Sequence, residues 1–150
     1  MQTKILKTYE EKEQGFKLRK KVFVEEQNVP MELEIDDMDN LDTTIHIGLY
    51  DDNNDFVGVA RILDINSSTL HIGRVAISKK HRGFGYGEAL IEGCHNVIKE
   101  LLPNKSVTIE LSSQLHAENF YKKLGYKRVN DIVYLDAGIE HIDMYIEIKQ

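Results

Sequence analysis

The sequence predicts one mixed α/β domain, residues 1–150, built around a single sheet. Three observations support this prediction. Apolar runs of strand length alternate with segments whose apolar residues recur at helical spacing. The turn-rich segments between them are short, and no composition break or Pro/Ser-rich linker divides the chain. With 150 residues, 41% hydrophobic and 29% charged, the chain has the size and composition of a globular domain with one core.

The first half of the chain predicts a strand, a helix and three more strands. Residues 3–8 form the first strand, and residues 10–27 form a helix that Pro30 ends. Two apolar runs, 44–51 and 55–65, are separated by the turn-rich sequence DDNN and therefore predict a hairpin. The next strand follows over residues 69–78 and completes this half.

The strand predicted over residues 69–78 moves its apolar residues from one face to the other. Leu70 and Ile72 share one parity, whereas Val75 and Ile77 share the opposite parity, so the alternation inverts near Gly73. A β-bulge inverts alternation in this way because it inserts one extra residue. A strand covered on both faces is an equally good explanation, because alternation carries little meaning there.

The second half predicts two helices and three strands. The first helix follows from the spacing of its apolar residues, which are Leu90, Cys94, Val97, Ile98 and Leu101. Residues 106–111 predict a strand, and residues 115–125 a helix of about three turns that Gly125 closes in the left-handed conformation. The runs 126–129 and 141–148 add the last two strands.

Composition and charge exclude several classes of protein. A net charge of −6 argues against a general nucleic-acid binder, and no run approaches the ~20 apolar residues of a membrane span. The N-terminus lacks the apolar core of a secretory signal, and the single cysteine cannot form an internal disulfide, so we expect a cytoplasmic protein. No Cys/His set has zinc spacing, and DDNNDFVG lacks the closing glutamate of a calcium loop, so we expect no metal.

The segment RVAISKKHRGFGYGEALIEG carries the strongest functional signal. Three alternate glycines follow a basic run there: Gly83, Gly85 and Gly87 after Lys79, Lys80, His81 and Arg82. Free N–H groups and the helix dipole at such a strand-to-helix turn make an anion site, which we favour over a solvated turn. The spacing excludes a P-loop, and Glu88 stands where a dinucleotide fingerprint starting at Gly83 needs its last glycine. The ligand is therefore expected to be another phosphate compound.

The same residues resemble a known family. RGFGYG, residues 82–87, resembles the Q/R-x-x-G-x-G/A motif of the GNAT superfamily of N-acetyltransferases, and AENFYKKLGY, residues 117–126, resembles its second coenzyme-binding segment. LRKKVFVEEQNVPMELEIDDMD and AGIEHIDM look like the ElaA-like subgroup, so the resemblance covers nearly the whole chain. It implies a three-layer αβα sandwich with a mostly antiparallel central sheet and a splayed, bulged fourth strand. The implied reaction transfers an acyl group from acetyl-CoA to a primary amine of a small molecule or peptide by direct attack.

The resemblance also implies which residues contact the coenzyme. The loop that would hold the pyrophosphate comprises Arg82, Gly83, Phe84, Gly85, Tyr86, Gly87 and Glu88. Val75, Ala76 and Ile77 would pair with the pantetheine arm, and a bulge there would leave backbone N–H groups free for the developing oxyanion. Asn119 resembles a coenzyme-contacting position, although a solvent-exposed helix position explains it nearly as well.

Tyr121 is the implied general acid for the departing thiolate. A phenol with a pKa near 10 can protonate a thiolate whose conjugate acid has a pKa near 8.5. Packing in the core beside Phe120 is the alternative role. For the general base we favour Glu110 and then His141, while other histidines and water relays to acidic residues stay open.

The sequence gives less information about the acceptor amine than about the coenzyme. No Lys or Arg occurs between Val22 and Ala60, where eleven Asp and Glu residues fall. A negative rim there would favour a cationic acceptor, and an acidic solvated surface explains the run equally well. The alternative to an enzyme is a non-catalytic CoA-binding sensor or interaction module, which Tyr121 and the intact loop disfavour. Dimerisation is common in the family, and an unpaired edge strand would serve a homodimer.

Overall fold

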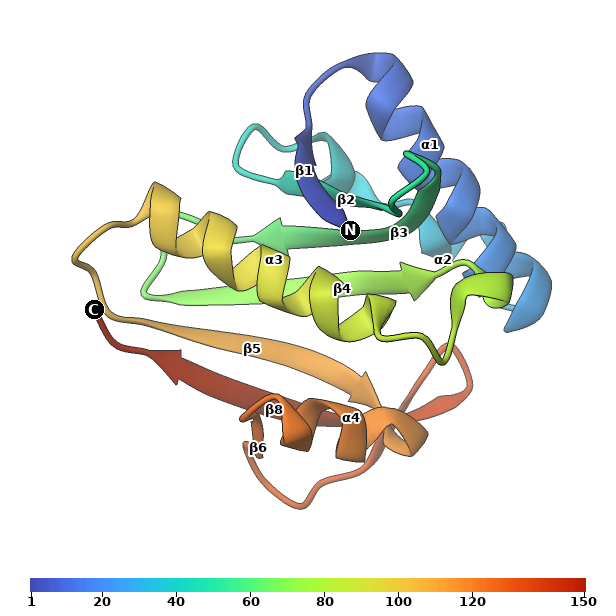
Figure 1. Ribbon diagram of the computed structural model, residues 1–150. Helices are drawn as coiled ribbons and strands as arrows, with labels where there is room; N and C mark the ends of the chain where they lie inside the picture. The colour runs from blue at the N-terminus through green and yellow to red at the C-terminus, as the bar shows by residue number, and fades with distance from the viewer.

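The computed structural model describes residues 1–150 and contains one eight-stranded sheet (Figure 1). Its strands are β1 (Gln2–Leu6), β2 (Ile45–Tyr50), β3 (Phe56–Leu63), β4 (Thr69–Ile77), β5 (Val107–Gln114), β6 (Lys127–Arg128), β7 (Tyr134–Asp136) and β8 (Ile139–Ile148). They lie in the order β1-β2-β3-β4-β5-β8-β6, and β7 also pairs with β8. Every pairing is antiparallel except that of β4 with β5. The mostly antiparallel sheet predicted above is confirmed.

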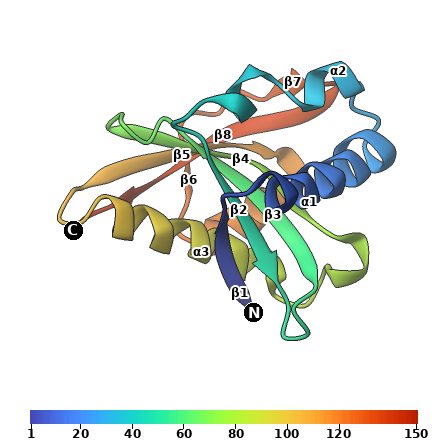
Figure 2. The same cartoon turned by 90° about the horizontal axis from the view of Figure 1, so that it is seen from above.

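Helices cover both faces of this sheet. They are α1 (Tyr9–Arg19), the π-helical η1 (Lys20–Glu26), α2 (Met31–Glu34), η2 (Asp37–Asn40), η3 (Lys79–His81), α3 (Tyr86–Leu101), η4 (Leu115–Ala117) and α4 (Glu118–Lys123). The apolar stripe of α3 and Tyr121 of α4 join the main core, while Leu18 and Val22 pack in a separate cluster with Val59 and Ala76. The views in Figures 1 and 2 show α1 on one side of the sheet and α3 on the other. The three-layer αβα sandwich is therefore confirmed. None of the helices combines the length and the apolar character that a membrane span needs.

The bulge indicated by the alternation is present in β4. The register of β4 against β3 changes by one residue around Arg74 and Val75. Arg74 has a φ of 50°, an uncommon conformation for a residue other than glycine. Because of the extra residue, Val75 and Ile77 pack against the same core cluster that contains Leu70 and Ile72.

β4 and β5 separate after a short stretch of pairing. They pair in parallel only from Thr69↔Thr108 to His71↔Glu110. Beyond this point β5 stays paired with β8, as far as Gln114. The edge of β4 that faces β5 therefore has no partner strand beyond His71, which is the splay implied by the family resemblance.

The structure differs from the predicted elements at several points, and the helix predicted over residues 10–27 is π-helical from Lys20. The helix predicted over residues 115–125 is shorter, a turn of 3-10 helix followed by six residues of α-helix, although Gly125 closes it at a φ of 99° as expected. The short helices α2 and η2 were missed because their acidic segment has no apolar periodicity. β7 was also missed, and it joins β8 through Ala137 and Gly138, whose φ angles of 50° and 77° suit a tight hairpin turn.

Candidate active site

The separation of β4 and β5 opens a cavity of about 720 Å³. Its wall combines β4 and the glycine loop that follows it with α4, which lies about 30 residues further along the chain. The residues of these segments on the wall include Val75, Ala76, Ile77, Arg82, Gly83, Gly85, Gly87, Glu88, Phe120 and Tyr121. The fold therefore brings most of the predicted coenzyme residues to one cavity.

The glycine loop ends in a helix N-terminus with free N–H groups. Gly83 and Gly85 have φ angles of 86° and 84°, and Gly85 is the N-cap of α3. No side chain caps this helix, and the N–H groups of its first turn, at Tyr86, Gly87 and Glu88, have no acceptor within the protein. These N–H groups and the positive end of the helix dipole make an anion site at the cavity wall.

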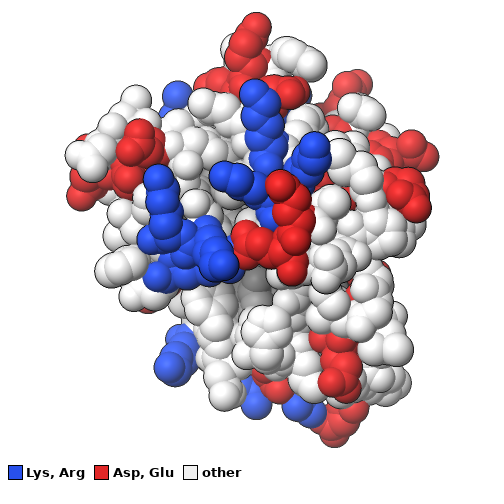
Figure 3. Space-filling model, turned by 90° about the vertical axis from the view of Figure 1, so that its right-hand side faces the viewer, with Lys and Arg blue, Asp and Glu red and all other residues white.

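Basic side chains accompany this anion site. Lys79 and Lys80 are exposed, and Lys and Arg side chains gather on the face shown in Figure 3, with acidic side chains beside them. Arg82 is already engaged, because its Nε donates to the carbonyl of Ile77 at 3.0 Å and its Nη1 lies 2.8 Å from a carboxylate oxygen of Glu26. Arg82 therefore links the loop to η1 as well as lining the cavity.

Tyr121 packs in the core and also lines the cavity. Its ring is only 8% exposed and belongs to the main core, with edge-to-face contacts to Phe120 and Tyr126 at 5.0 Å and 5.7 Å between ring centroids. Its hydroxyl makes no hydrogen bond within the protein and is not fully enclosed, so it opens onto the cavity. Burial raises the pKa of the Tyr121 phenol. Its hydroxyl is thus held at the cavity wall by the packing of the ring in the core.

His141 lies on the wall of the same cavity, whereas Glu110 does not. The Nδ1 atom of His141 is 2.7 Å from the carbonyl oxygen of Ile139. A carbonyl can only accept, so Nδ1 carries the hydrogen and Nε2 of the neutral ring has the free lone pair. The ring also stacks on Tyr134, at 6.0 Å between centroids. Glu110 instead occupies the last position of β5 that pairs with β4, and its carboxylate lies 4.0 Å from Nε2 of His71.

Three other predicted coenzyme residues lie outside the cavity wall. Asn119 and Phe84 are exposed, and Tyr86 is half-buried with its ring against His81. Their side chains are not brought to the cavity, although the backbone of Phe84 and Tyr86 belongs to the glycine loop. No group of three or more His, Cys, Asp or Glu side chains is placed to hold a metal ion.

Three residues of the acidic run are paired inside the protein, whereas others, such as Glu25, Glu32 and Asp37, are exposed. Three carboxylates bind three arginines from α1, β3 and β4, in an arrangement that we call the arginine network. Its pairs are Arg19–Glu34 at 2.7 Å, Arg19–Asp39 at 2.6 Å, Arg61–Asp36 at 2.7 Å, Arg61–Asp39 at 3.0 Å and Arg74–Asp36 at 3.3 Å. Burial alone would raise the pKa of Asp39, but hydrogen bonds and charge from Arg19 lower it to about 2. The sequence did not reveal these pairs because the arginines lie outside the acidic run.

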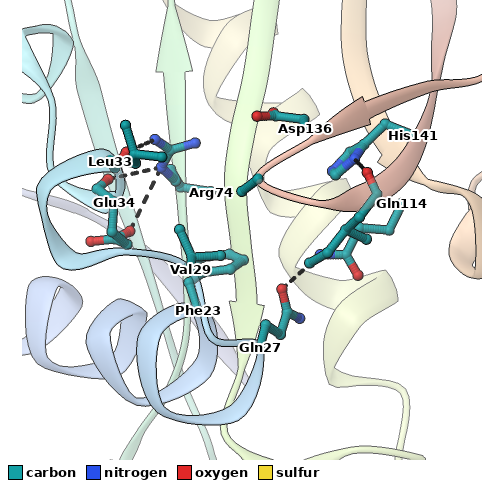
Figure 4. A pocket seen from close by; sticks show the side chains of 11 residues that line it. Phe23, Gln27, Val29, Leu33, Glu34, Arg74, Gln114, Asp136 and His141 are labelled. Atoms are coloured by element: carbon teal, nitrogen blue, oxygen red, sulfur yellow. Dashed lines mark hydrogen bonds and ion pairs between the residues drawn. The ribbon is translucent and has the colours of Figure 1, made fainter.

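A second, smaller cavity of about 90 Å³ adjoins the first (Figure 4). It lies between the segment from η1 to α2 and the turn that joins β7 to β8. Six residues line both cavities: Phe23, Gln27, Arg74, Gln114, Asp136 and His141. A hydrogen bond of 2.8 Å joins the side chains of Gln114 and Gln27 across this region. The two cavities are therefore neighbouring parts of one site.

Comparisons with known proteins agree with this geometry. The family model of the acetyltransferase (GNAT) domain matches residues 5–148. The uncharacterized N-acetyltransferase YjcF of Bacillus subtilis is 34% identical over 144 residues, covering 96% of this chain and 98% of YjcF. Protein ElaA of Escherichia coli is 38% identical over 135 residues, covering 89% of this chain and 85% of ElaA.

Solved structures show the same relationship. The crystal structure of Escherichia coli ElaA superimposes with a TM-score of 0.83 and 30% identity, covering 96% of this chain and 97% of ElaA. An aminoglycoside 6'-N-acetyltransferase complexed with coenzyme A shares the fold, with a TM-score of 0.71 and 18% identity over 98% of this chain and 97% of that one. The match of the family model over almost the whole chain, together with these relatives, shows that the chain belongs to the GNAT acetyltransferase family, in the group that includes ElaA.

Proposed function

We propose that residues 1–150 form one catalytic domain that transfers the acetyl group of acetyl-CoA to a primary amine by direct attack. The observation that carries this proposal is the large cavity, which connects the free N–H groups of the α3 N-terminus to the Tyr121 hydroxyl and to His141. The coenzyme fits this cavity because two parts of the cavity match two groups of the molecule: an anion site for the diphosphate, and a proton donor for the thiol.

Different segments of the chain bind the diphosphate and the pantetheine arm of the coenzyme. The N–H groups from Gly83 to Glu88 hold the diphosphate, and Lys79 and Lys80 add positive charge nearby. The unpaired edge of β4 beyond His71 offers backbone groups to the amides of the pantetheine arm, as an added strand would receive them. N–H groups on that edge also stabilise the negative charge that develops on the thioester oxygen.

Proton transfers at the reacting atoms fall to Tyr121 and His141. The amine nitrogen attacks the thioester carbon, the carbon–sulfur bond breaks with its electron pair on sulfur, and Tyr121 protonates the thiolate. The proton lost by the amine passes to Nε2 of His141. Burial raises the pKa of the Tyr121 phenol, so the phenol stays protonated at neutral pH and can donate its proton as negative charge develops on the sulfur.

Thiol release from acetyl-CoA with a panel of primary amines tests this function. We expect thiol release that depends on the presence of the amine. A His141→Gln variant should release thiol about 10²-fold more slowly, because glutamine can hydrogen-bond but cannot take up the proton. Calorimetric binding of coenzyme A without turnover of any amine would instead favour a non-catalytic sensor on the same fold.

A further inference from the structure

The small cavity next to the coenzyme cavity has the position of an acceptor site. It shares His141 with the larger cavity and lies at the end of the gap between β4 and β5. A molecule held there has the base beside it and faces the gap in which the thioester lies under the proposed function. What the cavity can hold therefore decides which amines are substrates.

The volume limits the acceptor to a small molecule. A cavity needs about 10–15 Å³ to hold one water molecule, which has one non-hydrogen atom. A cavity of about 90 Å³ therefore accommodates roughly six to nine non-hydrogen atoms. Five wall residues are apolar, namely Phe23, Val29, Leu33, Ala137 and Ile139. A compact molecule with a short apolar group fits these walls, whereas a multi-ring amine or a folded peptide segment does not.

Arg74 presents an unused donor to this cavity. Its Nε donates to the carbonyl of Glu34, and its Nη2 donates to the carbonyl of Leu33, both at 3.1 Å. Nη2 also lies 3.3 Å from Asp36, and the Glu34 carboxylate lies 3.6 Å from Nε. Nη1 has no partner within the protein and is not enclosed. Figure 4 shows these bonds holding the guanidinium against the α2 segment, which leaves one nitrogen without a drawn partner.

The opposite wall carries a negative charge and the base. Asp136 is exposed, makes no ion pair and lies at the end of β7, just before the turn to β8 that also places His141. Figure 4 shows Asp136 on the His141 side of the cavity, across from the α2 segment. The other carboxylate on the wall, Glu34, is paired with Arg19 through Oε1, while its Oε2 has no hydrogen-bond partner. The cavity therefore has an unpartnered guanidinium N–H of Arg74 beside the Glu34 carboxylate at one side, and the unpaired carboxylate of Asp136 at the other.

We propose that the acceptor is a free α-amino acid of about six to nine non-hydrogen atoms, whose carboxylate binds Nη1 of Arg74 and whose amino group lies between Asp136 and His141. A guanidinium N–H and a carboxylate form a strong, charge-assisted hydrogen bond. Asp136 attracts the ammonium form, His141 removes its proton, and the apolar walls receive the side chain. The proposal deepens the proposed function and rests on it, because it names the acceptor of that reaction.

Matched pairs of substrates test the proposal without any change to the protein. L-Leucine has nine non-hydrogen atoms, a number within the estimated range, and 3-methylbutylamine is the same molecule without its carboxylate. We expect kcat/KM for leucine to exceed that for the amine by about tenfold or more, as the loss of one charge-assisted hydrogen bond requires. Equal kcat/KM values, or turnover only of larger amines or peptides, would overturn the proposal.

An Arg74→Gln variant tests whether Arg74 causes this preference for leucine. We expect the preference for leucine over the amine to fall to within about threefold, because glutamine offers no charged donor to the carboxylate. Lys105→Gln, an exposed substitution that removes the same charge far from both cavities, should keep the full preference. If a folded Arg74→Gln protein kept the full preference for leucine, Arg74 would not be the residue that binds the carboxylate. If this variant does not fold, the comparison of leucine with 3-methylbutylamine in the unmodified protein tests the proposal.

Calorimetry with leucine and the protein saturated with coenzyme A separates this inference from the proposed function. Binding of leucine that Arg74→Gln weakens would support the amino-acid site even without acetyl transfer. Acetylation of simple amines with no binding of leucine would uphold the acetyltransferase and refute the amino-acid site.

Discussion

Replacing Tyr121 by phenylalanine separates catalysis from folding in this protein. The ring packs in the main core, and phenylalanine keeps that packing. The hydroxyl has no hydrogen-bond partner within the protein, so its loss removes no internal bond. We therefore expect the free energy of unfolding to change by about 0.5 kcal/mol or less.

Turnover should respond very differently. If Tyr121 protonates the thiolate, its loss lowers kcat by about 10²-fold or more, which corresponds to about 2.7 kcal/mol of activation free energy. Thiol release followed with a chromogenic disulfide gives kcat, and thermal unfolding followed by circular dichroism gives the stability of the same sample.

Tyr126 supplies the matched control on the same core. Its hydroxyl hydrogen-bonds to Nε2 of His95 at 2.7 Å, and burial lowers the pKa of His95 to about 4, so this imidazole stays neutral near pH 7. Tyr126→Phe leaves that nitrogen without a partner, which should cost about 1–3 kcal/mol of stability and leave kcat of the folded enzyme unchanged. Undiminished turnover in Tyr121→Phe, or a loss of turnover that simply follows a loss of stability, would refute the reasoning.

Three further predictions concern the loop, the arginine network and the packing of α3. Gly85→Ala places a side chain at a φ of 84° and should cost about 1–2 kcal/mol of stability, and it should raise the KM for acetyl-CoA but not that for the amine. Asp39→Asn removes a buried partner of Arg19 and should lower the stability at pH 7 by about 3–5 kcal/mol. Because the pKa of Asp39 is lowered to about 2, its ionised form stabilises the fold above about pH 4, so the difference from the natural protein in denaturant titrations should shrink as pH falls from 4 to 2. Gly93→Ala would bring its Cβ within 2.2 Å of Thr3 on β1 and should lower the stability by about 1–3 kcal/mol, of which Thr3→Ala should recover a part.

Local patterns predicted the fold well where side-chain periodicity decides the structure. The parity change between Ile72 and Val75 indicated the bulge, because alternation along a strand depends on the chain's own geometry. The segment of α2 and η2 gave no such signal. It is held by the arginine network, whose arginines come from α1, β3 and β4. The sequence alone cannot show which arginines pair with these carboxylates, because the partners are far apart along the chain.

In the candidate site, too, local features could be predicted from the sequence and features that depend on tertiary contacts could not. The glycines of the loop could be interpreted from the sequence because positive φ and a free helix N-terminus are local properties. The choice between Glu110 and His141 could not, since it depends on the position along β5 at which pairing with β4 ends. The register of a parallel pair is set by packing in three dimensions, and that register leaves Glu110 on the paired stretch. Nothing in the sequence indicated the free nitrogen of Arg74, because it follows from the carbonyl groups that hold the other two.

A crystal structure of the protein with coenzyme A tests the central claim most directly. We predict that diphosphate oxygens accept hydrogen bonds from backbone N–H groups between Gly83 and Glu88, and that the coenzyme sulfur lies beside the Tyr121 hydroxyl. A diphosphate bound away from the α3 N-terminus, or a sulfur outside the gap between β4 and β5, would contradict the account.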